Sequence, residues 1–369
     1  MTLSKKDIRK LNLEDLENHL TSIGEKSFRA KQIYEWLWKK NAHNFEDMTN
    51  LSKKLREELD NIFSIQNANV DLLQKSNDGT IKNGVKLHDG LMVESVLIPT
   101  ETRTTACVSS QVGCSLNCEF CATAKLKRMR NLDVAEIVDQ VALIDKQSKE
   151  YFDRPLSNIV FMGMGEPMMN YKNVVEAIRK ITTPEGLGMS PRRITVSTSG
   201  IPKMIKMLAD EKLKVKLALS LHSAIEHKRN DIMPFSEKFP LTEIMESLQY
   251  WYKETGSVVT FEYCVWKGIN DEEEDIKALI KYCRQVPSKV NLIQYNPIGE
   301  GKFDHRSIEA EEQYVRELEN AGITVMVRKS RGSDIDAACG QLANKNTDNS
   351  FFFLSFYLWK PLCLIFRLI

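Results

Sequence analysis

The strongest constraint on the fold is a regular alternation of strands and helices that begins near residue 100. Six runs of apolar or β-branched residues have the length of buried strands, at 104–109, 159–162, 194–197, 215–221, 258–264 and 290–295. Between them, apolar residues recur at helical spacing, and this repetition predicts a parallel sheet. Six units are too few for a closed eightfold barrel. We therefore expect an α/β fold with an open, partial (βα)6 barrel, to which 323–327 can add an edge strand.

The pattern divides the chain into four parts. Residues 1–65 form a predicted small helical module, because leucine and isoleucine recur there at helical spacing. Residues 66–99 form a predicted β-meander that links the module to the barrel, because Asn-Asp-Gly and His-Asp-Gly turns separate short β-like runs. The barrel then takes residues 100–343, and residues 344–369 form an atypical apolar tail.

The tail is nearly all apolar over 351–369, but Lys360, Pro361 and Arg367 interrupt it. A membrane-spanning helix needs about 20 mostly apolar residues, so this stretch lies at the lower limit. Two interpretations stay open: a membrane-associated tail, and an extension beyond the natural end of the domain, since the preceding sequence NKNTDNS is typical of such an end. We expect no membrane association.

Composition and charge are those of an ordinary globular protein. Of the 369 residues, 42% are apolar and 27% charged, and the net charge is +1. That balance does not indicate a nucleic-acid binder across the whole chain. The chain begins MTLSKKDIRK, without an apolar signal segment, so we expect a cytoplasmic protein. In that reducing compartment, the eight cysteines favour metal binding or catalysis over disulfides.

Three of the cysteines are closely spaced. Cys114, Cys118 and Cys121 form a C-x3-C-x2-C pattern directly after the first predicted barrel strand, which places three thiolates on one tight loop. A four-iron cluster normally takes four Cys ligands, so three leave one iron open to a substrate group. A structural zinc site is the alternative, but it requires a fourth nearby Cys or His. Neither occurs between Cys121 and His222, which favours an iron–sulfur cluster.

Polar and glycine-rich segments follow the other predicted strands, at the strand ends where the chemistry of such folds gathers. They lie at 163–167, 197–200, 220–222 and 296–297. Glycine allows close backbone approach, and a carboxylate accepts hydrogen bonds from an ammonium group. Taken alone, the GMGEP segment at 163–167 is compatible either with the binding of an amino group at Gly165 and Glu166 or with a simple turn at the start of a helix.

With these features together, the chain resembles the radical SAM superfamily, whose enzymes bind S-adenosylmethionine (SAM) at a [4Fe-4S] cluster. The resemblance implies a radical SAM barrel in which Cys114, Cys118 and Cys121 hold the cluster. It also implies that the open iron binds the amino and carboxylate groups of SAM, and that Gly165 and Glu166 receive the amino group. An electron from the cluster then cleaves SAM to a 5′-deoxyadenosyl radical.

Longer strings narrow the resemblance to the RlmN family. They are ACVSSQVGC at 106–114, FMGMGEP at 161–167, the segment 193–200, SLH at 220–222 and DIDAACGQL at 334–342. The resemblance covers about residues 10–343. It implies methylation of C2 of adenosine in 23S rRNA and in certain tRNAs at adenosine 37, through an S-methylcysteine and with two SAM per turnover.

The family resemblance also assigns residue roles. Cys339 matches the cysteine that takes a methyl group from one SAM, and the radical from a second SAM then abstracts hydrogen from that methyl group so that its carbon adds to C2. Cys107 matches the cysteine that attacks the Cys339 sulfur and releases the product through a transient disulfide. Glu94 aligns with the proton acceptor. The positions that match SAM contacts are Ser197, Ser220, Leu221, His222 and Asn296.

Taken alone, several of these residues have simpler interpretations. Cys107 lies in an apolar run and suits a core position, and Glu94 alternates with valines and suits a solvent-facing position. His222 is typical of a hydrogen-bonded structural histidine. Cys264 and Cys283 carry no matched motif, and we interpret them as structural.

Basic segments near the predicted strand ends suit RNA phosphates. They lie at 125–130, 192–193 and 328–331. The basic and aromatic helix at 26–40 either docks on the barrel or, as the resemblance implies, belongs to an RNA-binding accessory module. The target adenine must leave its stack to reach a buried site. We expect a monomer that acts on 23S rRNA and tRNA and receives electrons from a donor such as flavodoxin.

Two other functions are compatible with the same residues. A radical SAM methylase directed at C8 of the same rRNA adenosine shares the cysteine triad and the cysteine pair. A metal-stabilised RNA-binding protein without catalysis would bind zinc and release no 5′-deoxyadenosine from SAM. Identifying the methylated carbon and assaying 5′-deoxyadenosine separate these functions.

Overall fold

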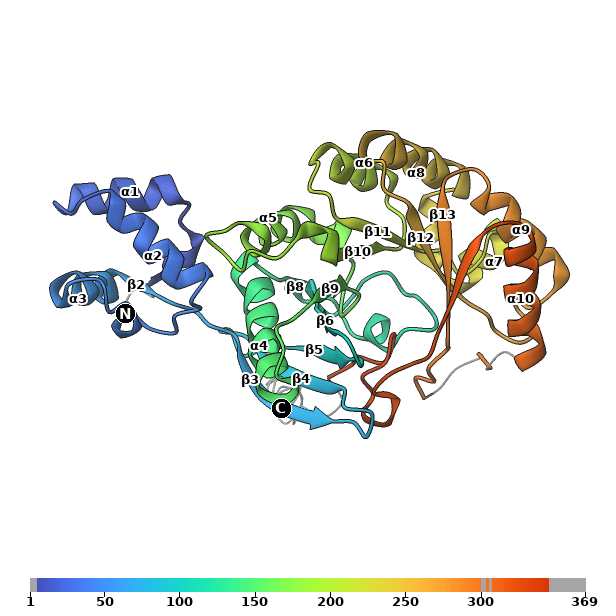
Figure 1. Cartoon of the computed structure of the whole chain (residues 1–369), viewed down its shortest axis with the longest axis horizontal. Coiled ribbons are helices and arrows are strands. Elements are labelled where there is room, and N and C mark those ends of the chain that lie inside the picture. The colour runs from blue at the N-terminus through green and yellow to red at the C-terminus, as the bar shows by residue number, and fades with distance from the viewer. Residues whose placement is uncertain (1–4, 300–302, 305–306, 345–369) are drawn as a thin grey trace, which may run out of the picture.

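The computed structural model of the chain describes residues 5–299, 303–304 and 307–344 (Figure 1). The apolar stretch 351–369, with its two open interpretations, lies outside the described residues. Within the described ranges, no helix is long and apolar enough to cross a membrane. All seven cysteines in that part of the chain are free thiols.

One ten-stranded sheet forms the centre of the molecule, in the order β14-β13-β12-β11-β10-β9-β6-β5-β4-β3. The strands from β6 to β14 in this order are parallel, so six strand–helix units and one further edge strand confirm the expected partial barrel. The parallel strands are β6 (Thr104–Cys107), β9 (Asn158–Phe161), β10 (Ile194–Thr198), β11 (Lys216–Ser220), β12 (Val259–Cys264), β13 (Ser288–Ile293) and β14 (Thr324–Arg328).

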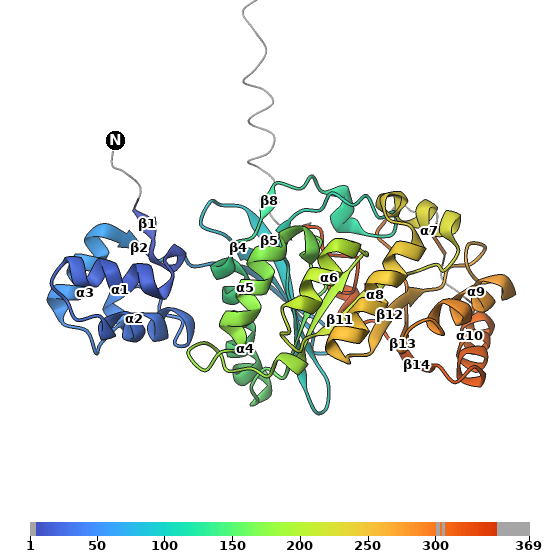
Figure 2. The ribbon, with the colours of Figure 1, turned by 90° about the horizontal axis from the view of Figure 1, so that it is seen from above.

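Helices connect the parallel strands and cover one side of the curved sheet (Figures 1 and 2). Asp133 begins the first of them, because its carboxylate accepts a hydrogen bond from the Glu136 N–H while Glu136 bonds back to the Asp133 N–H. The connecting helices are α4 (Val134–Phe152), α5 (Tyr171–Thr182), α6 (Pro202–Asp210), α7 (Glu226–Ile232), α8 (Leu241–Thr255), α9 (Glu273–Cys283) and α10 (Ile308–Asn320).

The two faces of a barrel strand have different partners. On β12, the rings of Phe261 and Tyr263 pack against Tyr282 of α9 and Tyr314 of α10, with centroid distances of 5.6 Å in both pairs. Successive side chains of a strand point to opposite faces. Glu262, between those two aromatic residues, therefore points away from the helices, into the barrel interior.

The β-meander continues the barrel sheet. Its strands are antiparallel, and β5 pairs with the first barrel strand β6, so that Val96 lies opposite Cys107. The turn sequences predict hairpins but give no sign of this pairing, because strand partners depend on tertiary packing rather than on turn residues. The meander strands are β3 (Asn69–Lys75), β4 (Ile81–Lys86) and β5 (Met92–Pro99).

The N-terminal module lies at one end of the molecule, beside α4 and α5 (Figure 2). Its helices are α1 (Leu13–Ser22), α2 (Phe28–Trp38) and α3 (Lys53–Ile62), and β1 (Lys6–Asp7) pairs with β2 (Phe63–Ser64). A buried ion pair joins it to the barrel: Arg9 Nη1 lies 2.7 Å from Asp139 Oδ1 on α4. The other Asp139 oxygen accepts a hydrogen bond of 2.9 Å from the Ala68 N–H.

We predict that Asp139→Ala destabilises the protein strongly, because it removes the nearer carboxylate from the buried Arg9 guanidinium and leaves it with Asp7, 3.7 Å from Arg9 Nε. Breaking a buried pair in this way costs about 3–5 kcal/mol. Urea unfolding measures the effect. The control is Glu57→Gln, which breaks an exposed pair between Lys53 and Glu57 and should cost less than about 1 kcal/mol. Equal effects of the two variants would contradict the prediction.

Candidate active site

The three clustered cysteines lie on a loop that follows β6 and the short strand β7 (Gln111–Val112) and ends in a 3-10 turn at Ala122–Lys125. Burial raises the pKa of Cys118, and the nearby thiols of Cys121 and Cys114 raise it further. Burial also raises the pKa of Cys114 to about 11. These effects show that the three thiols lie close together in a shielded place.

The donor set fits an iron–sulfur cluster with one iron left open. Three thiolates on one loop are the soft ligands that such clusters take, and metal binding supplies the charge that deprotonates buried thiols. In the described part of the chain, no group of three or more His, Cys, Asp or Glu side chains already has the spacing of a metal site. The loop therefore collects the thiols without fixing them in ligand positions.

The cysteine loop is held from two sides. The Phe120 ring lies 4.6 Å from the His222 ring and 5.4 Å from the Trp266 ring, measured between centroids, which anchors the loop to the ends of β11 and β12. On the other side, the Ala122 N–H donates to the Gly340 carbonyl over 2.7 Å, and the Thr123 hydroxyl donates to the Leu342 carbonyl over 2.6 Å.

Gly165 and Glu166 lie beside the cysteine loop. Gly165 has a φ of +92°, and a Cβ atom there would lie 2.5 Å from the Gln111 side chain, so only glycine suits the position. Glu166 is buried, and its Oε2 accepts hydrogen bonds from the Ser199 N–H and hydroxyl, at 2.9 and 3.0 Å. Burial raises the pKa of Glu166, and these bonds oppose the rise.

His222 has the contacts of a structural histidine. Its Nδ1 accepts a hydrogen bond of 3.2 Å from the Cys264 N–H, and its carbonyl accepts one of 2.6 Å from the Asn270 side chain. Burial lowers the pKa of His222 to about 3, and the Arg229 guanidinium lowers it further, so the imidazole is neutral. Its ring nevertheless faces Phe120 of the cysteine loop. The other predicted SAM contacts, Ser197, Ser220, Leu221 and Asn296, lie at the ends of neighbouring strands or just beyond them.

Residues 336–344, here called the Cys339 segment, bring the remaining predicted cysteine to this place. Figure 1 shows the chain after β14 running back toward β4 and β5. Asn296 Nδ2 donates to the Cys339 carbonyl over 3.2 Å, and Gln341 Nε2 donates to the Pro297 carbonyl over 3.1 Å. Residues 296–297, which follow the sixth barrel strand β13, thus bind the Cys339 segment directly.

Cys339 is exposed, yet protein groups surround its thiol. Burial of the thiol raises the pKa of Cys339 to about 11, and the Glu262 carboxylate and the Cys121 thiol raise it further. Cys107 is buried on β6, where burial raises its pKa and the Cys339 thiol adds to the rise. The Cys339 thiol therefore acts electrostatically on Cys107, and Cys121 of the triad acts on Cys339.

Glu94 is buried on β5, so the solvent-facing interpretation is wrong. Its Oε1 lies 3.2 Å from the ammonium of Lys82, and its Oε2 accepts hydrogen bonds from the N–H groups of Ala343 and Asn344, at 2.8 and 3.1 Å. Lys82 also donates to the Asp336 carbonyl over 3.4 Å. These two residues therefore bind both ends of the Cys339 segment.

Two functional neighbours were not predicted from the sequence. Lys82 lies in a strand of mixed composition, and nothing in its pattern distinguishes it from the exposed Lys86. Glu262 could have been found, because a carboxylate in the apolar run 258–264 is unusual unless it has a buried partner.

The predicted RNA-contacting segments differ in exposure. Lys127 and Arg128 are exposed near the cysteine loop, whereas Arg130 is bonded to Glu136 and Asp89. In α2, Trp38 is buried, as expected of a helix that docks with its aromatic residues in the core. The basic residues of the segments 192–193 and 328–331 are exposed as well, so most of the predicted basic side chains are accessible.

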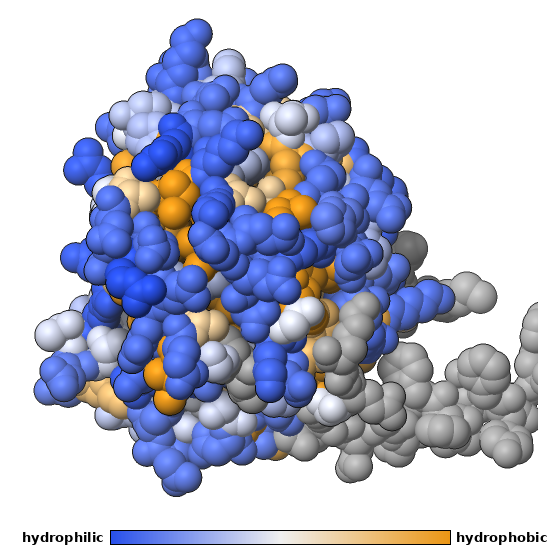
Figure 3. Space-filling model, turned by 90° about the vertical axis from the view of Figure 1, so that its right-hand side faces the viewer, coloured by the Kyte–Doolittle hydropathy of each residue, from blue (hydrophilic) through white to orange (hydrophobic). Residues whose placement is uncertain are grey.

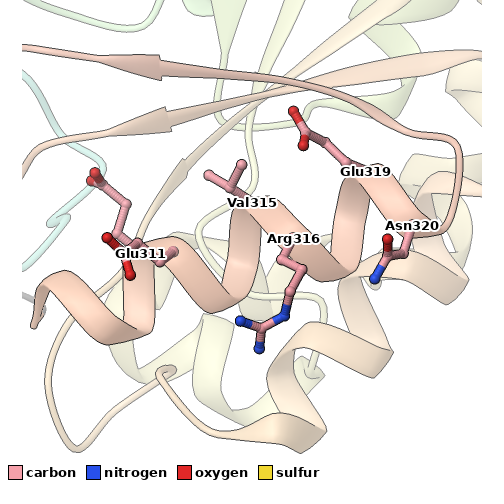
Figure 4. A pocket seen from close by; sticks show the side chains of 6 residues that line it. Glu311, Val315, Arg316, Glu319 and Asn320 are labelled. Atoms are coloured by element: carbon pink, nitrogen blue, oxygen red, sulfur yellow. The ribbon is translucent and has the colours of Figure 1, made fainter.

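A hollow of about 270 Å³ along α10 lies apart from the cysteines (Figure 4). Glu311, Val315, Arg316 and Glu319 are among its lining residues. The space-filling view toward this end of the molecule shows a mainly hydrophilic surface with scattered apolar residues (Figure 3). None of the predicted site residues lines this hollow.

The cysteine loop at the end of the first barrel strand and the partial barrel define a radical SAM enzyme. Residues 108–280 match the radical SAM superfamily, and residues 6–65 match the ribosomal RNA large subunit methyltransferase N-terminal domain. A crystal structure of a radical SAM methyltransferase from Sphaerobacter thermophilus superposes with a TM-score of 0.86 at 38% identity, covering 91% of this chain and 99% of that one.

Two curated relatives specify the family. A protein of Christiangramia forsetii named "probable dual-specificity RNA methyltransferase RlmN" is 65% identical, over 93% of this chain and 97% of its own length. The "dual-specificity RNA methyltransferase RlmN" of Geotalea uraniireducens is 43% identical, over 93% and 98%. The chain belongs to the RlmN family of radical SAM RNA methyltransferases.

We predict that Lys82→Met loosens the Cys339 segment, because Glu94 loses its cation and Asp336 loses a donor. Hydrogen–deuterium exchange should become faster at Ala343 and Asn344 by about tenfold or more, the effect of weakening hydrogen bonds to a charged group. Lys82→Arg keeps the charge and should restore most of the protection. Lys86→Met, on the exposed part of the same strand, is the control. Unchanged exchange in Lys82→Met would contradict the clamping role.

Proposed function

We propose that this enzyme methylates C2 of adenosine in 23S rRNA and in tRNA at adenosine 37. The observation that carries the proposal is the position of Cys339. Its carbonyl accepts a hydrogen bond from Asn296, and the next residue, Gly340, accepts one from Ala122, which directly follows Cys121. A methyl-carrying thiol must lie close to the source of the radical and to a second thiol that can release it. The names of the relatives, dual-specificity RNA methyltransferases, support the RNA substrates.

In this proposal Cys114, Cys118 and Cys121 hold the [4Fe-4S] cluster. SAM contacts fall to Gly165, Glu166, Ser197, Ser220, Leu221, His222 and Asn296. When bound, the cluster and SAM supply a methyl group and an organic radical, which suit a ring carbon that ordinary base-assisted methylation cannot attack. The neutral imidazole of His222 leaves its Nδ1 as an acceptor, and this keeps the ring fixed against the cysteine loop.

The two remaining cysteines have complementary roles. The Cys339 thiol loses its proton, accepts the methyl group on sulfur and presents it to the base. Cys107, as a thiolate, attacks the Cys339 sulfur, so that a sulfur–sulfur bond forms as the carbon–sulfur bond to the product breaks. The product carbon keeps the electron pair of that bond and takes up a proton, which completes its methyl group. Burial keeps the Cys107 thiol protonated in the resting state, which limits premature attack on Cys339.

Glu94 is the proposed acceptor of the C2 proton. Its oxygens are bonded to Lys82 and to the amides of Ala343 and Asn344. To take a proton, Oε2 must therefore give up or weaken its bonds to the Cys339 segment. Proton transfer and movement of that segment are linked in this proposal.

We predict that Cys339→Ala abolishes adenosine methylation, because the methyl carrier is lost. Cys107→Ala should instead stop the reaction before release and leave RNA covalently bound to Cys339. Denaturing gels and mass spectrometry of the nuclease-digested protein detect that adduct. Cys283→Ala, a buried cysteine outside the site, is the control and should keep activity. Normal turnover by Cys339→Ala would remove the proposed carrier.

The regiochemistry needs a direct measurement. Anaerobically reconstituted enzyme is given SAM, reductant and RNA, and the digested nucleosides are identified by mass spectrometry. We predict 2-methyladenosine and 5′-deoxyadenosine. If 8-methyladenosine is the only methylated product, the enzyme methylates C8 and not C2. If the protein binds zinc and forms no 5′-deoxyadenosine, it is a non-catalytic RNA-binding protein.

A further inference from the structure

Glu262 and Asn291 form a buried polar pair inside the barrel, outside the residues that the proposed mechanism uses. They lie opposite each other on β12 and β13, and Asn291 Nδ2 donates to Glu262 Oε1 over 2.7 Å. Glu262 is 7% exposed and Asn291 is 1% exposed. The aromatic residues on either side of Glu262 pack on the helices, so both polar side chains point into the interior.

The pair is incompletely satisfied. Asn291 Oδ1 is buried and has no hydrogen-bond partner among the described residues. Leaving a buried acceptor without a donor destabilises the fold, so native structures rarely keep one without a reason. The amide cannot simply be turned over, because its Nδ2 is required to donate to the Glu262 carboxylate. A donor from a ligand would satisfy Oδ1.

The location of the pair indicates which ligand. Glu262 lies beside Ser220 across β11 and β12, at the edge of the barrel where the predicted site residues gather. Among the charged groups near the Cys339 thiol, the Glu262 carboxylate raises the pKa of that thiol most. In adenine, C6 is separated from C2 by N1 alone, so a base whose C2 is presented to Cys339 carries its 6-amino group on the adjacent edge of the six-membered ring. The amino group then lies near the Cys339 thiol, where the Glu262 carboxylate also acts.

We propose that Glu262 and Asn291 recognise the exocyclic amino group of the target adenine. The inference rests on the proposed function, since it assumes that an adenine is presented to Cys339. The amino group carries two N–H donors. One can bond to Asn291 Oδ1 and the other to the Glu262 carboxylate. Guanine, which has a carbonyl oxygen at this position, would place an acceptor against two acceptors, so the pair selects adenine.

The test compares RNA with and without the amino group. The substrates are tRNA with adenosine at position 37 and the same tRNA with purine riboside there, given to anaerobically reconstituted enzyme. For the wild-type enzyme we expect kcat/KM to be at least about 10- to 100-fold higher with adenosine, the range for hydrogen bonds to buried or charged groups. Asn291→Ala should lose most of this preference, because it slows the adenosine substrate and leaves the purine substrate nearly unchanged.

A second variant and a control guard against a change in folding. Glu262→Gln has nearly the same shape but puts an N–H donor where the carboxylate was, so it should also lose the preference. Tyr263→Phe alters the opposite face of the same strand and should keep the wild-type ratio. Methylation of Cys339 by SAM precedes any contact with the base, so its rate should remain at the wild-type value in Asn291→Ala. Glu262→Gln removes a carboxylate that raises the pKa of the Cys339 thiol, so its methylation rate is measured separately and is not the control.

The outcomes separate this inference from the function on which it rests. If the wild-type enzyme forms no 2-methyladenosine, the proposed function fails. If it methylates adenosine but the pair variants slow both RNAs equally, the amino-group inference alone is overturned. A weaker SAM affinity in the pair variants, measured by equilibrium dialysis, would show that the pair serves SAM and would also overturn it.

Discussion

The contact between the Cys339 segment and the cysteine loop is the interaction on which the site depends. Two hydrogen bonds, from Ala122 to Gly340 and from Thr123 to Leu342, join segments more than 200 residues apart in the sequence. Gly340 has a φ of +82°, and a Cβ atom there would lie 3.2 Å from the Phe120 carbonyl. A side chain at this position would strain the backbone and crowd the loop, so the residue after Cys339 is constrained by the contact.

The β-meander provides the other half of this support. Because β5 pairs with β6, the meander places Glu94 and Lys82 beneath the end of the Cys339 segment. Asp334 adds to the attachment, since its carboxylate accepts hydrogen bonds from the Ser76 hydroxyl and the Asn77 N–H in the turn between β3 and β4. An antiparallel extension of the barrel sheet thus adds to the hydrogen bonds that the cysteine loop, Asn296 and Pro297 make with the Cys339 segment.

The parallel repeat could be predicted from the sequence because apolar period and turn residues are local properties. The predicted run 258–264 begins one residue before β12, and the predicted run 323–327 begins and ends one residue before β14. The position of the cysteine loop followed from the strand before it. The ion pair of Lys82 and Glu94 could not be predicted, because it depends on how the meander pairs with the barrel. The polar pair of Glu262 and Asn291 likewise depends on strand register, which a single sequence does not specify.

Two buried carboxylates act on the Cys339 segment: Glu94 bonds to its end, and Glu262 raises the pKa of the Cys339 thiol, and their surroundings differ. Glu94 is bonded to an ammonium and two backbone amides, so its charge is balanced and its oxygens are occupied. Burial raises the pKa of Glu262, and the Arg328 guanidinium and the Asn291 amide oppose the rise. Environments that separate two carboxylates in this way commonly separate their roles. Glu94 is suited to hold the Cys339 segment until a proton arrives, and Glu262 is suited to hold a neutral donor group such as an amine.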